Sequence, residues 1–310
     1  MPLRPLHLAL ALTLATPQTS PAPYTLTTGV DEVSLTFHAS DPYGNPITTL
    51  TLTDLRILDN NKPPRAVVSF DAYTNLPIRA GILLDISSSM DESLPRNFAI
   101  ATGFARQLLH TPDDRAFLLR FDSASKLAQD WTSDPNLLIA TIPHLTDNLR
   151  SHLGGTALFD TLYRTCRDQF AEFGTLRASP TANVILLFTD GIDNASHALI
   201  EDDTRICQRA HTSIYVFSDA LRPGLSPGQK ILTQLTSQTG GLIFFANPQL
   251  DIPADLRLIE SNLRSQYRLV YKPQILKPDG AFHRIKLETP GRAASLTVPT
   301  GYNAPSRSTP

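Results

Sequence analysis

Five polar side chains in three short segments have oxygen atoms that could hold a metal ion. Asp85, Ser87 and Ser89 alternate in one segment, so a carboxylate and two hydroxyls can turn toward the same point. Thr156 follows two glycines, and Asp190 lies in a Thr-Asp-Gly sequence. Such hard oxygen ligands suit magnesium or manganese. These residues therefore predict one bound divalent cation, Mg²⁺ or Mn²⁺. The alternative without a metal is that they only cap helices and form turns.

The segments around the two aspartates read as strands buried on both faces. Asp85 ends a nearly continuous apolar run that begins at Ile78, and Asp190 follows a run over residues 183–189. Unbroken apolar runs of this kind are typical of parallel sheets covered by helices on both sides. In such sheets, ligands bind at the carboxyl ends of strands that flank a topological switch. Asp85 and Asp190 should therefore meet if their strands are neighbours.

Apolar stretches with helical periodicity alternate with the buried strands. The pattern predicts helices over residues 95–110, 137–145, 157–173, 199–210, 230–238 and 254–265, and further strands over 116–121, 213–218 and 242–245. Alternation of this kind indicates an α/β fold, with a doubly wound and mostly parallel sheet. The lone tryptophan, Trp131, is expected to pack in the core.

The order and strand placement of the five polar residues resemble the metal-ion-dependent adhesion site of von Willebrand factor A domains. Residues 76–262 look like that Rossmann-like domain, although Ser88 stands where the family often has glycine. The flanks, residues 41–70 and 267–302, are similar to those of a VWFA-related subfamily known from acidobacteria. The resemblance implies an adhesion or protein-binding module that is not an enzyme.

The ligand chemistry also favours binding over catalysis. Magnesium prefers six oxygen ligands, so the expected set leaves a coordination position for an outside group. The partner would be a protein or an extracellular-matrix-like ligand that presents a carboxylate. One alternative is an envelope scaffold with a structural metal. Another is a hydrolase of the haloacid dehalogenase type, but Ser87 replaces that family's second aspartate, and Lys126 lies in a strand-like stretch.

Other catalytic motifs are missing from the sequence. It contains no His-Glu-x-x-His pair, no Gly-x-Ser-x-Gly elbow and no glycine-rich phosphate loop. Asp193 either assists the metal site, caps the following helix or is simply solvated. The formal net charge of -2 gives no support for a nucleic-acid partner.

Short strands with alternating apolar residues make up both flanks. Residues 24–75 and 266–302 each offer about three strands, which need a second layer to bury their apolar faces. We expect them to pack together as a small β-sandwich into which residues 76–262 are inserted. Residues 303–310 are expected to form a frayed tail.

Cys166 and Cys207 lie on the predicted helices before and after the Asp190 strand. Right-handed crossovers would place both helices side by side on one face of the sheet. The sequence therefore predicts a disulfide between these residues, and the alternative is two buried free thiols.

The first 22 residues have the features of a signal peptide. Arg4 precedes a short apolar stretch from Leu6 to Ala15, which is about half the length needed to span a bilayer. No later apolar run is long enough to span. We expect a mature chain without a transmembrane segment, secreted or held in the periplasm or cell envelope.

Overall fold

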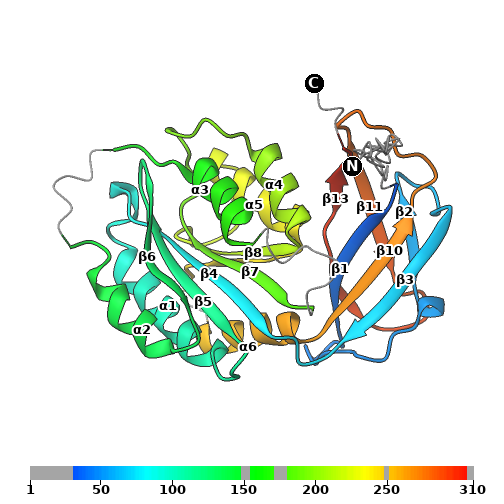
Figure 1. Cartoon of the computed structure of the whole chain (residues 1–310), viewed down its shortest axis with the longest axis horizontal. Helices are drawn as coiled ribbons and strands as arrows, with labels where there is room; N and C mark the ends of the chain where they lie inside the picture. Colours follow the sequence, from blue (N-terminus) through cyan, green and yellow to red (C-terminus); the bar gives the residue numbers. More distant parts are fainter. Residues whose placement is uncertain (1–30, 148–153, 171–179, 248–250, 306–310) are drawn as a thin grey trace, which may run out of the picture. The chain divides into compact units, whose positions relative to one another are not determined.

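The computed structural model describes residues 31–147, 154–170, 180–247 and 251–305, in which three sheets form. One is a six-stranded sheet covered by helices, and the others are antiparallel sheets of four and three strands (Figure 1). None of the helices in these ranges is long and apolar enough to cross a membrane. The predicted signal peptide, residues 1–22, and most of the predicted tail lie outside the described residues.

The six-stranded sheet has the order β6-β5-β4-β7-β8-β9. Its strands are β4 (Ile78–Asp85), β5 (Arg115–Phe121), β6 (Ser125–Thr132), β7 (Ala182–Phe188), β8 (Thr212–Ser218) and β9 (Ile243–Phe245). All neighbours are parallel except β5 and β6, so the predicted doubly wound, mostly parallel sheet is confirmed. The sequence analysis did not place β6 in the sheet. Its residues are exposed or half-buried throughout, so they form no apolar run.

Two helical layers cover this sheet. The helices are α1 (Leu94–Leu108), α2 (Pro135–Thr141), α3 (Leu158–Arg164), α4 (Ile200–Arg209), α5 (Pro227–Thr239) and α6 (Ile252–Arg264). Helices α1, α2 and α6 pack against one face, and α3, α4 and α5 against the other. Side chains of β4 alternate between these cores: Ile82 and Leu84 face the first, and Leu83 the second. Of the helix predicted over 157–173, residues 158–164 form α3 and Thr165–Gln169 form a π-helical turn, while residues 171–173 lie outside the described residues.

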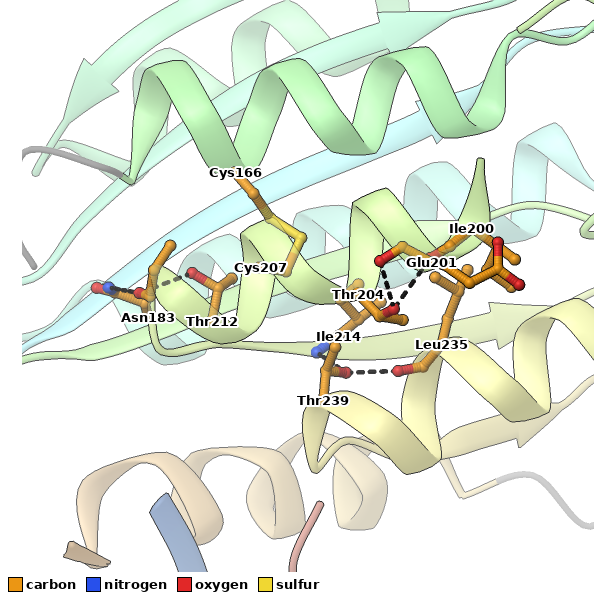
Figure 2. The surroundings of a disulfide bond; sticks show 11 residues. Cys166, Asn183, Ile200, Glu201, Thr204, Cys207, Thr212, Ile214, Leu235 and Thr239 are labelled. Atoms are coloured by element: carbon orange, nitrogen blue, oxygen red, sulfur yellow. Dashed lines mark hydrogen bonds between the residues drawn. A yellow bond between two sulfur atoms is a disulfide. The ribbon is translucent and has the colours of Figure 1, made fainter. Parts of the chain in front are cut away.

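The predicted disulfide between Cys166 and Cys207 is present, with a Cα–Cα distance of 5.0 Å (Figure 2). It joins the π-helical turn after α3 to α4, inside the core formed by that helical layer. Figure 2 also shows threonine side chains that donate hydrogen bonds to carbonyls one turn earlier in their own helices, such as Thr239 Oγ1 to Leu235 O. Closing a loop of 41 residues stabilises the fold by on the order of 4 kcal/mol in the chain-entropy estimate.

Strands from the two flanks form a small β-sandwich, as predicted. The four-stranded sheet has the order β12-β1-β10-β3, and the three-stranded sheet the order β13-β11-β2. Their bounds are β1 (Val33–Ser40), β2 (Arg56–Asp59), β3 (Ala66–Tyr73), β10 (Gln266–Lys272), β11 (Phe282–Glu288), β12 (Ser295–Thr297) and β13 (Gly301–Asn303). Phe37 pairs with Tyr267, and Ile57 with Leu287. These residues share one apolar core, so neither flank is a separate unit.

The chain enters and leaves the α/β part at the same place. Leu76 N donates to Arg264 O at 3.1 Å, and the Arg264 guanidinium donates back to Leu76 O at 3.1 Å. Because β3 leads into Leu76 and β10 begins directly after α6, this contact joins both connections to the β-sandwich. Insertion of the α/β part therefore leaves the carboxyl ends of its strands free of these connections.

Candidate metal centre

Strands β4 and β7 place Asp85 and Asp190 at the same edge of the sheet. The two strands are parallel neighbours, with Leu84 paired to Phe188. Asp85 is the last residue of β4, and Asp190 lies two residues beyond the end of β7. The negative charge of Asp190 is close enough to contribute to raising the pKa of Asp85. The topology therefore brings the two predicted carboxylates together.

Hydroxyl and amide donors surround the Asp85 carboxylate, which is 0% exposed. Its Oδ1 accepts hydrogen bonds from Ser87 N at 3.0 Å and Ser87 Oγ at 2.6 Å. Its Oδ2 accepts one from Thr189 Oγ1 at 2.7 Å. Ser87 Oγ lies 3.3 Å from Ser89 Oγ, and Ser89 is exposed. The three alternating oxygens therefore form a connected row that leads from the buried carboxylate to the surface.

The Asp85 carboxylate has no ion-pair partner among residues 31–147, 154–170, 180–247 and 251–305. Burial raises its pKa from 3.8 to about 6, against the hydrogen bonds from Ser87 and Thr189. None of the ion pairs among the described residues involves Asp85 or Asp190. Arg96 donates to Ser218 O at 3.2 Å and to Asn97 Oδ1 at 3.0 Å. The centre therefore combines two neighbouring carboxylates without a counter-charge from the described residues.

Close backbone packing shapes the turn that carries Asp190. Gly191 has φ +82°, and a Cβ at this position would lie 2.6 Å from Gly228 O at the start of α5. A Cβ on Gly228 would in turn lie 2.3 Å from Asp190 O. Only glycine fits both positions, since a side chain would push the two loops apart. Ile192 N donates to Asp190 Oδ1 at 2.8 Å, so one carboxylate oxygen caps its own turn.

Thr156 is buried in the loop before α3 and is attached to the segment after Asp190. Its N–H donates to Asn194 Oδ1 at 2.6 Å, and its carbonyl accepts from Asn194 N at 3.0 Å. Ala157 N donates to Asp122 O at 2.7 Å, which joins the same loop to the end of β5. Thr156 is thus fixed at the carboxyl edge of the sheet, where Asp85 and Asp190 lie.

Several residues of this region were missed or left open by the sequence analysis. Thr189 precedes Asp190 inside an apolar run, and its threonine hydroxyl was the one available signal of its contact with Asp85. Asp193 accepts from Phe159 N at 3.0 Å, so it binds the first turn of α3 rather than capping the following helix.

Trp131 packs edge-on against Phe117 and Phe170, as its expected core role requires.

The donor set of the five predicted residues fits a hard divalent cation. It offers two carboxylates and three hydroxyls, which are oxygen ligands of the kind that magnesium and manganese take. Within the described residues, no group of three or more His, Cys, Asp or Glu side chains is placed to hold a metal ion. A site with two carboxylates is of a different kind, because hydroxyls supply the rest of its ligands. The bound metal itself stays a prediction.

Comparisons with known proteins bear on the fold. Residues 81–192 match the model of the von Willebrand factor type A domain. Similar solved structures include BatB from Bacteroides thetaiotaomicron, with 14% identity over 59% of this chain and 97% of that chain and a TM-score of 0.46. A von Willebrand factor type A protein from Catenulispora acidiphila has 12% identity, coverage of 78% and 74%, and a TM-score of 0.44.

Proximal thread matrix protein 1 from the mussel byssus, in a form with a zinc-occupied MIDAS motif, is also similar. Its identity is 15%, the coverage is 61% of this chain and 48% of that chain, and the TM-score is 0.45. The search of curated proteins found no match. The family match over residues 81–192 agrees with the mostly parallel sheet covered by helices on both faces, so this part of the chain has a von Willebrand factor A-like α/β fold.

Proposed function

We propose that this protein is an exported binding module that holds one divalent cation, Mg²⁺ or Mn²⁺, through Asp85, Ser87, Ser89, Thr156 and Asp190. The observation that carries the proposal is the buried Asp85 carboxylate, which lies beside Asp190 and has no cationic partner among the described residues. A bound cation would neutralise both carboxylates. It would also offer an open coordination position at the surface, where Ser89 is exposed.

The partner is a protein or extracellular-matrix-like ligand that presents a carboxylate. Mg²⁺ prefers six oxygen ligands, so a set of five residues leaves a position for solvent or for an outside oxygen. An acidic group is a natural ligand for this position, because hard cations such as Mg²⁺ take carboxylate oxygens and three of the five protein ligands are neutral hydroxyls. The family to which the domain is matched contains protein-interaction modules, which agrees with binding rather than catalysis.

Export is proposed from the sequence of residues 1–22 and from the disulfide. Disulfides persist in oxidising compartments such as the periplasm and the extracellular space, and are rare in the cytosol. The Cys166–Cys207 bond lies in the core of the α/β domain, where an oxidising compartment would preserve it. Release of the mature chain into a periplasmic or extracellular fraction tests this part of the proposal.

Isothermal titration calorimetry with Mg²⁺ tests the metal site. We expect the parent protein to bind one equivalent and the Asp85→Ala variant to show no measurable binding, because the buried carboxylate is lost. Asp71→Ala is the matched control, since Asp71 is an exposed aspartate on β3 of the sandwich. Equal Mg²⁺ affinity in the parent and in Asp85→Ala would refute the assignment.

A pull-down from envelope extract tests the partner. Immobilised parent protein should retain a partner in Mg²⁺ and release it on chelation, and the Asp85→Ala variant should retain none. Retention that is insensitive to both the chelator and the substitution would contradict metal-dependent binding. Metal binding without any retained partner would instead favour a scaffold with a structural metal.

A further inference from the structure

We propose that Asn194 is a positioning residue that locks Thr156 against the Asp190 segment before any metal binds. The inference rests on the proposed metal site, but its structural part concerns the metal-free chain. It assigns a role to a residue that lies outside the set of five expected ligands. The argument starts from the backbone of Thr156, which has to be fixed if its hydroxyl is to face the same point as Asp85 and Asp190.

Three hydrogen bonds attach the Thr156 backbone to residues 194–195. Thr156 N donates to Asn194 Oδ1 at 2.6 Å, while Asn194 N and Ala195 N donate to Thr156 O at 3.0 and 3.1 Å. Both polar groups of the Thr156 backbone are therefore satisfied by the same short segment. Thr156 is only 4% exposed, so water cannot readily replace a lost partner.

The neighbouring residues extend this attachment into the first turn of α3. Phe159 N donates to Asp193 Oδ2 at 3.0 Å, and Asp160 N donates to Ser196 Oγ at 2.9 Å. Ser196 Oγ also donates to Asp193 Oδ2 at 2.6 Å, which holds the two acceptors together. The beginning of α3 and the segment that follows Asp190 thus form one hydrogen-bonded unit.

Gly155 shows how close the two segments are. A Cβ at this position would lie 2.2 Å from Asn194 Oδ1 and 3.1 Å from the Ala195 Cβ. Any side chain at Gly155 would therefore push Asn194 away and break its bond with Thr156 N. The glycine permits the close contact that places the Asn194 amide against the loop.

The disulfide holds the same pair of segments further along. Cys166 follows α3 and Cys207 lies on α4, so the helices that come after Thr156 and after Asn194 are covalently joined. Asn194 holds the same two segments together at the end that carries the expected ligands. Thr189 Oγ1 then connects the unit to Asp85 through its bond at 2.7 Å. Partners of this kind, which hold ligands without touching the metal, typically contribute 10- to 100-fold in metal affinity.

The main experiment compares Mg²⁺ affinity in the parent, Asn194→Ala and Asn194→Asp by calorimetry at a temperature where all are folded. Asn194→Ala removes the acceptor, so we expect binding about 10- to 100-fold weaker. Asn194→Asp keeps an acceptor oxygen and adds negative charge, so it should bind as tightly as the parent or tighter. The matched control is Asn136→Ala, because Asn136 is exposed on α2 and its side chain bonds only within its own turn.

Amide hydrogen exchange in the metal-free protein provides the second readout. The Thr156 amide should be protected in the parent, in Asn194→Asp and in Asn136→Ala, and should exchange faster in Asn194→Ala. Parent-like affinity in Asn194→Ala, or equal weakening in Asn194→Ala and Asn194→Asp, overturns the inference. If the parent binds no Mg²⁺, the proposed function fails, and protection of the Thr156 amide still decides whether the lock exists.

A double-substitution cycle tests the contact itself. Gly155→Ala in the parent should weaken Mg²⁺ binding, because the added methyl collides with Asn194 Oδ1. In the Asn194→Ala background the same substitution should cost much less, since the colliding oxygen is gone. Additive effects of the two substitutions would show that the residues act independently and would overturn the proposed lock.

Discussion

A buried aspartate lies at each end of strand β4, Asp114 from the segment before β5 and Asp85 from β4 itself, and the two carboxylates have different partners. At the amino end, Asp114 accepts from the first residue of the strand, with Ile78 N at 2.9 Å from its Oδ1. The Arg264 guanidinium donates to both Asp114 oxygens at 2.9 Å, and Thr111 N adds a further bond at 2.9 Å. At the carboxyl end, the donors to Asp85 within the described residues are the Ser87 amide and the hydroxyls of Ser87 and Thr189.

The pKa values of the two groups reflect this difference. Burial alone would raise the pKa of Asp114, but the guanidinium and the backbone N–H groups lower it to about 2. Burial raises the pKa of Asp85 to about 6, and its hydrogen bonds only moderate the effect. Asp114 is therefore satisfied within the fold, whereas the described part of the chain gives Asp85 no ion-pair partner, and an outside cation could take that place. Asp114 therefore has the partners of a structural carboxylate, whereas Asp85 has those of a carboxylate suited to binding a cation.

The largest change in the free energy of unfolding is expected from replacing Arg264, which provides the positive charge at the amino end of β4. Arg264→Met leaves the Asp114 carboxylate buried without its counter-charge, which should lower the free energy of unfolding by about 3 to 5 kcal/mol. Urea denaturation at pH 7 in the absence of metal measures this loss, with exposed Arg284→Met as the control. A loss below about 1 kcal/mol is typical of surface ion pairs. Such a result would show that Asp114 does not depend on the charge of Arg264.

At the carboxyl end of β4, a substitution is expected to raise the free energy of unfolding rather than lower it. Asp85→Asn removes a charge that the fold disfavours, and the difference between 3.8 and about 6 corresponds to about 3 kcal/mol. The metal-free variant should therefore be more stable than the parent at pH 7 by up to about 3 kcal/mol. The advantage should shrink below pH 6 and disappear well below pH 3.8, where Asp85 of the parent is protonated in both the folded and the unfolded state.

Denaturation curves from pH 3 to 8 measure this difference, and Mg²⁺ should stabilise the parent but not Asp85→Asn. The Asp114 contribution has the opposite pH dependence. It is fully present above about pH 4 and is lost as the pH falls toward 2, because the pKa of this group is lower in the folded state. A metal-free Asp85→Asn variant that is less stable than the parent at pH 7 would show that Asp85 is a structural residue like Asp114.

The smallest effect is expected from Thr189→Val, which keeps the shape of the side chain and removes one donor to Asp85. The Thr189 bond lowers the pKa of Asp85, so its loss should raise that pKa further. Protons then compete with Mg²⁺ at a higher pH. We expect the midpoint of Mg²⁺ binding against pH to move upward, with a stability change of about 1 kcal/mol. An unchanged midpoint would mean that Thr189 does not influence the Asp85 carboxylate.

The sequence predicts the parts of this arrangement that depend on local patterns. The apolar runs that end at Asp85 and Thr189 predict buried parallel strands, and the sheet confirms them. The partners of these residues are harder to predict, because they come from distant segments. Asn194 lies 38 residues from Thr156, and Arg264 lies 150 residues from Asp114. No periodicity links such pairs, since their contact depends on how the helices pack.

The pairing of β1 with β10 has a consequence for the order in which the chain can fold during synthesis. Val33 pairs with Tyr271, so the first strand of the sandwich has to wait until more than two hundred further residues have left the ribosome. The ladder of the α/β domain joins only residues between Ile78 and Phe245, all of which emerge earlier. Once that domain forms and Leu76 meets Arg264, a long loop-closure search becomes a short one. In this order of events, the contact between Leu76 and Arg264 would bring the two halves of the sandwich together after the inserted domain has formed.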